Sequence, residues 1–123
     1  MCDGRIYKIF EKNLSWFDAY SYCAGLGGHL VTITSAVEQT FIELYMNSVS
    51  LDSRCWIGGY NDGDSFKWVT DEEFDYTNWY KGEPNNQKLI EFFGEINYEE
   101  FGKWNDLPPQ ALRYLICEWE AAE

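Results

Sequence analysis

Apolar residues, mostly β-branched and aromatic, dominate residues 5–11 (RIYKIFE), and this pattern predicts a first strand. The next segment, NLSWFDAYSYCAGLGG, has a helical spacing of apolar residues, with Ser15 as a suitable N-cap and two glycines at its end. The residues of its predicted buried face are Trp16, Tyr20, Cys23 and Leu26. After the glycines, HLVTI predicts a short strand.

A second helix is predicted in SAVEQTFIELYMNSV, where Ser35 followed by Glu38 fits a capping box. Its predicted buried stripe consists of Phe41, Leu44, Tyr45 and Val49. Beyond Cys55 the pattern changes to short strand-like segments separated by Gly, Asn, Asp and Pro: CWIGG, FKWV, EFFGEI, KWND and RYLICEWE. Two helices followed by many short strands indicate the α+β class.

The region from about residue 61 to residue 106 is long and poor in predicted regular structure, and ordered loops of this length usually carry function. Side-chain oxygens gather within it, on Glu83, Asn85, Glu91, Asn105 and Asp106. Carboxylate and amide oxygens are the ligands that calcium prefers, at roughly six to eight per ion. Asp and Asn are also ordinary turn residues, so composition alone leaves both interpretations open. The spacing of an EF-hand loop is missing.

Composition narrows the function classes. The 123 residues favour one domain, spanning 1–123. The net charge of −12 argues against binding to nucleic acid or anionic membranes and suits a cation. An apolar run long enough to cross a membrane is missing, and the first ten residues lack the features of a signal peptide.

The chain has four cysteines, Cys2, Cys23, Cys55 and Cys117, and none lies in a CxxC pair. Together with the single His29, this argues against structural zinc and thioredoxin-type chemistry. An even number of cysteines in a small aromatic-rich domain favours an oxidising compartment, with free buried thiols as the alternative. The sequence spacing does not select a pairing.

Four separated motifs, WIGG, NWYKGEPNN, GKWND and YLICEWE, occur in an order that resembles the C-type lectin-like domain family. The segment SWFDAYSYCAGLGGHLVTITSAVEQ is similar to the opening of that family, so the resemblance covers about Tyr7 to Trp119. It implies a C-type lectin-like α+β fold with two helices, short antiparallel sheets and a long calcium-binding loop.

The resemblance also implies a site. Glu83 and Asn85 match the acid and amide of the EPN motif, Glu91 matches the next carboxylate, and Asn105 and Asp106 match the WND motif. In similar domains these five residues bind one Ca²⁺ and hydrogen-bond two vicinal sugar hydroxyls. Asp106 adds its backbone carbonyl, and the peptide bond before the EPN proline is cis. EPN resembles the mannose-type subset, which implies mannose, N-acetylglucosamine, glucose or fucose as ligand.

Further expectations come from the same comparison of motifs. Cys23 and Cys117 match a long-range disulfide of the family, whereas Phe93 and Pro109 occupy the positions of its second one. Cys2 and Cys55 are additional, and a bridge between them is expected, with free thiols or a bond from Cys2 to a partner chain as alternatives. Five tryptophans match core positions, namely Trp56, Trp68, Trp79, Trp104 and Trp119.

Three smaller features stand beside the main site. The loop YNDGDSF carries Asn61, Asp62 and Asp64 where similar domains hold auxiliary calcium ions, although the match is inexact and Phe92 stands where such a site needs an acid. His29 is expected to be structural. Tyr80, close to the EPN motif, is a candidate for stacking on a sugar.

The resemblance favours calcium-dependent sugar binding, with glycans or glycoproteins as partners in an extracellular or cell-surface setting. The alternative is a protein-interaction or adhesin domain that does not bind sugar, since one fold hosts many functions. An enzyme is not expected, because calcium would occupy the paired carboxylates and no nucleophile–base pair stands out. A larger multidomain or multivalent parent protein would compensate for weak single-site binding.

Overall fold

The computed structural model describes residues 4–84 and 92–120. Its helices are α1 (Trp16–Gly25) and α2 (Ala36–Ser48). Its strands are β1 (Ile6–Leu14), β2 (His29–Leu30), β3 (Cys55–Asn61), β4 (Phe66–Trp68), β5 (Phe93–Ile96), β6 (Trp104–Leu107) and β7 (Arg113–Trp119). The predicted α+β class is confirmed. In these described ranges neither helix is long and apolar enough to cross a bilayer.

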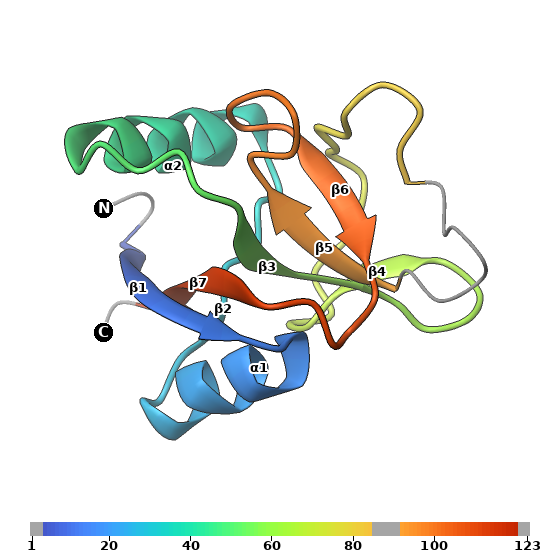
Figure 1. The fold of residues 1–123 in the computed structure, drawn as a ribbon, viewed down its shortest axis with the longest axis horizontal. Helices are drawn as coiled ribbons and strands as arrows, with labels where there is room; N and C mark the ends of the chain where they lie inside the picture. The colour runs from blue at the N-terminus through green and yellow to red at the C-terminus, as the bar shows by residue number, and fades with distance from the viewer. Residues whose placement is uncertain (1–3, 85–91, 121–123) are drawn as a thin grey trace.

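The strands form a sheet in the order β1-β7-β3-β5-β6, with β2 paired to β7 and β4 paired to β3 (Figure 1). All neighbouring strands are antiparallel except β3 and β7, which run parallel, so the sheet is mixed rather than antiparallel throughout as expected. The described chain begins and ends on the paired strands β1 and β7, with α1 and α2 on opposite sides of them (Figure 1). The β4 hairpin and one end of β5 and β6 lie on the side away from the termini.

Helix α1 begins as predicted, because the Ser15 hydroxyl accepts the backbone N–H of Asp18 at 3.2 Å. Its predicted buried face is only half correct. Trp16 and Cys23 are buried, whereas Tyr20 and Leu26 are exposed. The helix therefore packs on a narrower stripe than its aromatic content indicated.

Helix α2 is turned differently from the prediction. The capping interaction is present, since Ser35 accepts the N–H of Glu38. The buried residues are Glu38, Gln39, Ile42 and Met46, while Leu44 is 62% exposed and Val49 is 53% exposed. The predicted stripe is therefore half correct, since Phe41 and Tyr45 are half-buried whereas Leu44 and Val49 are exposed. Gln39 is buried instead, because it accepts a hydrogen bond from the Trp104 indole at 3.0 Å and donates to the Gly102 carbonyl at 2.8 Å. The spacing of apolar residues cannot predict burial of a polar side chain by such distant hydrogen-bond partners.

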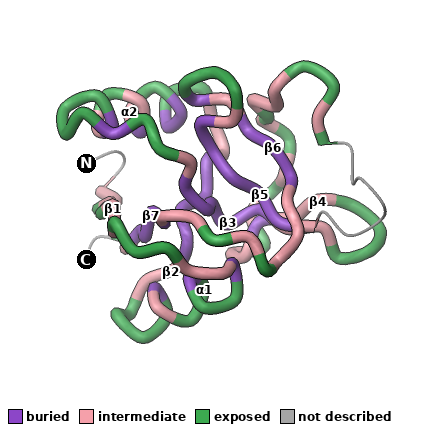
Figure 2. The backbone as a smooth tube through the Cα atoms, viewed as in Figure 1, coloured by how far each residue is buried: buried purple, intermediate pink, exposed green. Residues whose placement is uncertain are grey.

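The tryptophans organise the core, as predicted from their positions. Trp56, Trp68 and Trp104 have no exposed surface, and Trp79 and Trp119 are half-buried against the core. Trp104 makes edge contacts with Trp68 and Trp79 at centroid distances of 5.5 and 5.6 Å. The longest runs of buried residues lie in β3 and in β5, and shorter buried runs lie in β6 and β7 (Figure 2). A rigid platform of aromatic rings thus lies beneath the strands that carry the candidate site.

The long-range disulfide implied by the resemblance is present, between Cys23 and Cys117. It closes a loop of 94 residues, and chain entropy gives such a cross-link a contribution of about 4–5 kcal/mol to the free energy of unfolding. The expectation of a bridge between Cys2 and Cys55 is wrong for Cys55, which is a free and fully buried thiol. Burial, with Glu95 and Glu11 nearby, raises the pKa of the Cys55 thiol to about 12. Cys2 lies outside the described residues.

Aromatic packing occupies the place of the family's second disulfide. The ring of Phe93 stacks on Trp16 at 4.4 Å, and the backbone N–H of Trp16 donates to the Pro109 carbonyl at 3.3 Å. Trp16 therefore contacts both positions where the resemblance places cysteines. The start of β5 and the segment before β7 are joined through one buried residue of α1 instead of a covalent bond.

Candidate functional site

Glu83 lies in a turn whose conformation is set by its neighbours. Its backbone N–H donates to the Tyr80 carbonyl at 2.8 Å, and Gly82 has a φ of 88°, which glycine adopts without a steric penalty. The Glu83–Pro84 peptide bond is cis, as the resemblance implies. The Glu83 side chain is half-buried.

The chain that enters this turn is bonded to β6. The N–H of Tyr80 donates to the Trp104 carbonyl at 2.9 Å, and the N–H of Trp104 donates to the Asn78 carbonyl at 3.0 Å. Trp79 forms a parallel bridge with Trp104. Because Asn105 and Asp106 directly follow Trp104, the turn that carries Glu83 is held beside them.

Asn105 and Asp106 are the most buried of the predicted ligands that the structure describes, with exposed fractions of 4% and 0%. The antiparallel register of β5 and β6 places Asn105 opposite Glu95 and Asp106 opposite Gly94. Polar side chains buried to this degree need partners of opposite hydrogen-bonding character. Asn105 has such a partner, since its side-chain amide donates to the Glu95 carboxylate at 2.9 Å.

Asn85 and Glu91 lie outside the described residues, so their predicted roles stay predictions. The described residues on either side of them are both tied to β6. On one side the turn at Glu83 is anchored through Tyr80, and on the other Phe92 donates its N–H to the Leu107 carbonyl at 3.2 Å. The segment that contains both predicted ligands therefore starts and ends beside β6.

Sequence reasoning missed Glu95. This carboxylate has no exposed surface and accepts hydrogen bonds from Asn105 on one oxygen and from the Arg113 guanidinium, at 2.9 Å, on the other. The available signal was an acid inside the strand-like segment EFFGEI. A single acid in a predicted strand does not identify its partners, and both partners come from other strands.

Residues 12–119 match the family described as Lectin C-type domain. The chain belongs to the C-type lectin domain family. This is a binding family rather than an enzyme family, and its members commonly bind calcium. Glycans are accordingly the class of ligand that the family suggests.

Curated relatives agree with this assignment. The chain is 34% identical over 121 residues to C-type lectin lectoxin-Lio1 of Erythrolamprus poecilogyrus, covering 94% of this chain and 74% of the relative. It is 32% identical over 122 residues to a C-type lectin mannose-binding isoform of Notechis scutatus scutatus, covering 94% and 77%.

Solved structures of C-type lectin-like domains superpose closely on this one. The carbohydrate-recognition domain of mouse scavenger receptor C-type lectin has a TM-score of 0.85 at 29% identity, covering 98% of this chain and 91% of that one. The domain of cow CD23, solved in the presence of a GlcNAc2Man3 oligosaccharide, has the same TM-score, identity and coverage. A calcium-independent type II antifreeze protein has a TM-score of 0.86 at 26% identity, covering 99% and 91%. The fold therefore does not by itself require calcium.

In this C-type lectin domain the loop that corresponds to the auxiliary calcium sites of similar domains satisfies most of its own polar groups. Asn61 accepts the N–H of Gly63, and Asp62 accepts the N–H groups of Asp64 and Ser65. Asp62 also pairs with Lys67, and this contact is the main reason that the pKa of Asp62 is lowered to about 2. A lysine thus supplies positive charge at the loop where an auxiliary ion was considered.

A second group of potential ligands surrounds His29. Ligand atoms of His29, Glu118 and Glu120 lie within 4.8 Å of one another. Arg5 already supplies a cation there, with guanidinium nitrogens 3.0 Å from Glu118 and 3.4 Å from Glu120. His29 also contacts the Leu30 carbonyl at 2.7 Å, which agrees with a structural role.

Tyr80 is packed against protein rather than standing alone on the surface. Its ring makes an edge contact with Tyr98 at 5.4 Å. Desolvation raises the pKa of Tyr98, and the nearby carboxylates of Glu83 and Glu99 add to this effect. The two tyrosines therefore form one wall beside Glu83, and stacking of Tyr80 on a sugar stays a prediction.

Proposed function

We propose that this chain binds sugars in a calcium-dependent manner, with Glu83, Asn85, Glu91, Asn105 and Asp106 as the shared ligands of one Ca²⁺ and of two vicinal sugar hydroxyls. One observation carries the proposal. The turn with Glu83 and the residue after Glu91 are both hydrogen-bonded to β6, the strand that carries the buried Asn105 and Asp106.

The residues that the structure describes fit a calcium site by their chemistry. Glu83 and Asp106 are carboxylates and Asn105 is an amide, and oxygen donors of these types suit a hard cation. Calcium, when bound, would polarise the sugar hydroxyls. The side chains themselves would fix the sugar, because carboxylates accept hydrogen bonds from hydroxyl groups and amide N–H groups donate to hydroxyl oxygens.

The order of acid and amide around Pro84 supports mannose-type sugars, meaning mannose, N-acetylglucosamine, glucose or fucose. The relative from Notechis scutatus scutatus is called a mannose-binding isoform. The cow CD23 domain was solved with an oligosaccharide that contains N-acetylglucosamine and mannose. Both similarities support this ligand class.

The second candidate is an interaction domain that needs neither calcium nor sugar. The similarity to a calcium-independent antifreeze protein favours it, because that protein has the same fold. The five oxygen ligands favour the first candidate. A surface that only binds proteins gives no reason for an acid before Pro84 and an amide after it, together with the amide and acid of the WND motif.

Calcium titration by isothermal calorimetry tests the proposal. The wild-type chain should bind one Ca²⁺ at this site with a dissociation constant in the millimolar range or below. Asp106→Asn should abolish this binding, because it removes a ligand charge from a buried site. Glu73→Gln, which removes one exposed charge elsewhere, should leave it unchanged. Absence of calcium binding in the wild type would refute the proposal.

We further propose that residues 1–123 act as one carbohydrate-recognition domain in an extracellular or cell-surface setting. The disulfide between Cys23 and Cys117 supports an oxidising compartment. Repetition of the domain in a larger or oligomeric protein would raise the avidity for glycoproteins well above the affinity of one site.

A further inference from the structure

Glu95 occupies an unusual position for a carboxylate. It lies on β5, next to the edge strand β6, yet it has no exposed surface and stands directly opposite Asn105. Its Oε2 accepts from Asn105 Nδ2 at 2.9 Å and its Oε1 accepts from Arg113 Nε at 2.9 Å. Arg54 Nη1 lies 3.8 Å from Oε2.

The chemistry of this contact has one consequence for Asn105. An asparagine amide has two ends of nearly equal shape, one that accepts and one that donates. An ionised carboxylate only accepts, so the NH₂ end of Asn105 must face Glu95. The Oδ1 end of Asn105 must then point away from Glu95.

We propose that Glu95 is the positioning residue of the binding site, a role that rests on the calcium site proposed above. Glu95 fixes the amide of Asn105 so that Oδ1 is presented as a metal ligand. One N–H of Asn105 is bound to Glu95, and the second N–H is left for a sugar hydroxyl. Partners behind a metal ligand commonly orient it in this way.

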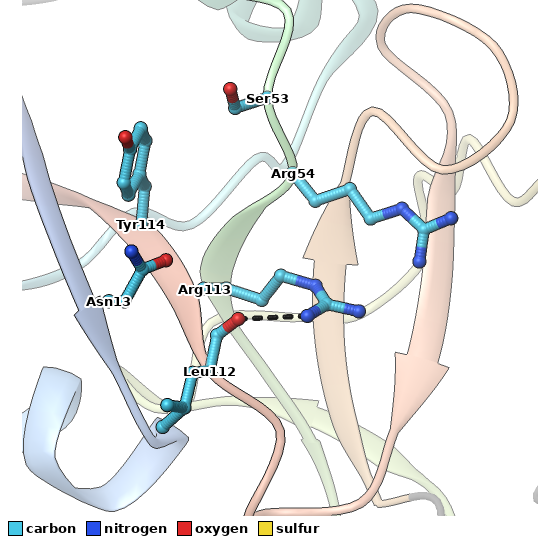
Figure 3. A pocket seen from close by; sticks show the side chains of 6 residues that line it. All are labelled: Asn13, Ser53, Arg54, Leu112, Arg113 and Tyr114. Carbon is cyan, nitrogen blue, oxygen red and sulfur yellow. Dashed lines mark hydrogen bonds between the residues drawn. The ribbon is translucent and has the colours of Figure 1, made fainter.

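The two arginines compensate the charge of Glu95. Arg54 and Arg113 line an open pocket of about 470 Å³ together with Asn13, Ser53, Leu112 and Tyr114. Figure 3 shows that both arginine side chains extend in the same direction, towards β5 and β6. Arg54 also stacks on Tyr98, with its guanidinium carbon 4.9 Å from the ring centre. Both guanidinium groups therefore face acids of this chain, Arg113 facing Glu95 and Arg54 lying between Glu95 and Glu99, which leaves little positive charge for an anion in the pocket.

A purely structural reason for Glu95 is weak. The backbone of β5 and β6 is paired at this point without any side chain. Replacing a buried ion pair by apolar side chains is often neutral or stabilising. A buried acid that contacts both an arginine and a predicted ligand is therefore better explained by its effect on that ligand.

Glu95→Gln provides a sharp test because of Arg113. The arginine only donates, so the side-chain oxygen of the introduced glutamine would turn towards Arg113 and its NH₂ group towards Asn105. Asn105 would then have to turn its own oxygen towards that NH₂ group, away from the metal. Calcium binding should weaken by roughly 10–100-fold, the range found for partners of metal ligands.

The rescue variant is Glu95→Gln combined with Arg113→Met. Without Arg113, the oxygen of the introduced glutamine is free to face Asn105 again, so the double variant should bind calcium several-fold more tightly than Glu95→Gln alone. If Glu95 had only a structural role, the double variant should bind calcium no more tightly than Glu95→Gln, because a second buried contact has been lost. Glu99→Gln is the matched control, since it removes an acid that pairs with Arg54 at 3.6 Å without facing Asn105, and it should bind like the wild type.

Nuclear magnetic resonance of the calcium-free chain in EDTA gives an independent readout. The two side-chain amide protons of Asn105 should be well separated in shift and protected from exchange in the wild type, and altered in Glu95→Gln. Three results would overturn the role of Glu95 without overturning the calcium site. These are unchanged calcium binding in Glu95→Gln, a double variant that binds calcium no more tightly than the single one, and identical Asn105 signals in wild type and Glu95→Gln. Failure of the wild type to bind calcium would overturn the site and this role together.

Discussion

At the scale of single residues, the candidate site combines carboxylates, which only accept hydrogen bonds when ionised, with an amide that can both accept and donate. Glu83 and Asp106 accept, Asn105 can do both, and Glu95 determines which end of Asn105 faces the site. The sequence indicated the ligands through their motifs, but it did not indicate Glu95. Its role comes from a contact between strands, and the acid itself carries no motif.

The acid and the amide beside Pro84 should select the sugar. Exchanging them, as Glu83→Gln with Asn85→Asp, reverses which position accepts and which donates while leaving the net charge unchanged. We expect the preference to move from mannose towards galactose, because similar domains of the galactose type carry the sequence QPD where this chain has EPN. Competition with free mannose and galactose measures this shift. An unchanged sugar profile in a variant that still binds calcium would contradict the assigned selectivity.

At the scale of elements, the sequence predicted the two helices and where they begin, but it predicted only part of the face that each helix buries. Both serine caps are correct because capping depends on residues only a few positions apart. The buried face of α2 was only half predicted, because Gln39 is held by the distant Trp104 and Gly102, and Glu38 pairs with Arg5 at 2.8 Å. The helical spacing of apolar residues gives no information about polar partners that are distant in the sequence.

Two aliphatic residues of α2 test its orientation. Ile42 is fully buried, whereas Leu44 is 62% exposed. Ile42→Ala should lower the free energy of unfolding by about 2–5 kcal/mol, and Leu44→Ala should change it by no more than about 0.5 kcal/mol. Urea unfolding of both variants measures the difference. The stripe predicted from periodicity alone gives the reverse order, so a larger loss for Leu44→Ala would contradict the structure.

At the scale of the whole molecule, an ion-pair cluster joins the two ends of the described chain. Arg5, just before β1, pairs with Glu38 of α2, with Glu72 and with Glu118 of β7. Glu118 is fully buried, and Thr32 donates its backbone N–H to it at 2.9 Å. Desolvation raises the pKa of Glu118 from 4.5 to about 7. Motifs in the sequence gave no indication of this cluster.

This raised pKa predicts how stability depends on pH. Between pH 4.5 and about 7 the folded chain keeps a proton on Glu118 that the unfolded chain has lost. Stability should therefore fall as pH rises through this window, by at most about 1.4 kcal/mol per pH unit. Glu118→Gln removes this contribution, and the exposed Glu73→Gln serves as control. Urea unfolding in EDTA at several pH values measures the pH dependence of the free energy of unfolding. Equal pH dependence in wild type and Glu118→Gln would refute the raised pKa of Glu118.

The central claim is that one set of oxygen ligands binds both calcium and sugar, and glycan-array binding with and without calcium tests it most directly. We expect binding to glycans that carry terminal mannose, N-acetylglucosamine, glucose or fucose when calcium is present, and complete loss of that binding in excess EDTA. Binding to the same glycans that persists in excess EDTA would contradict the claim.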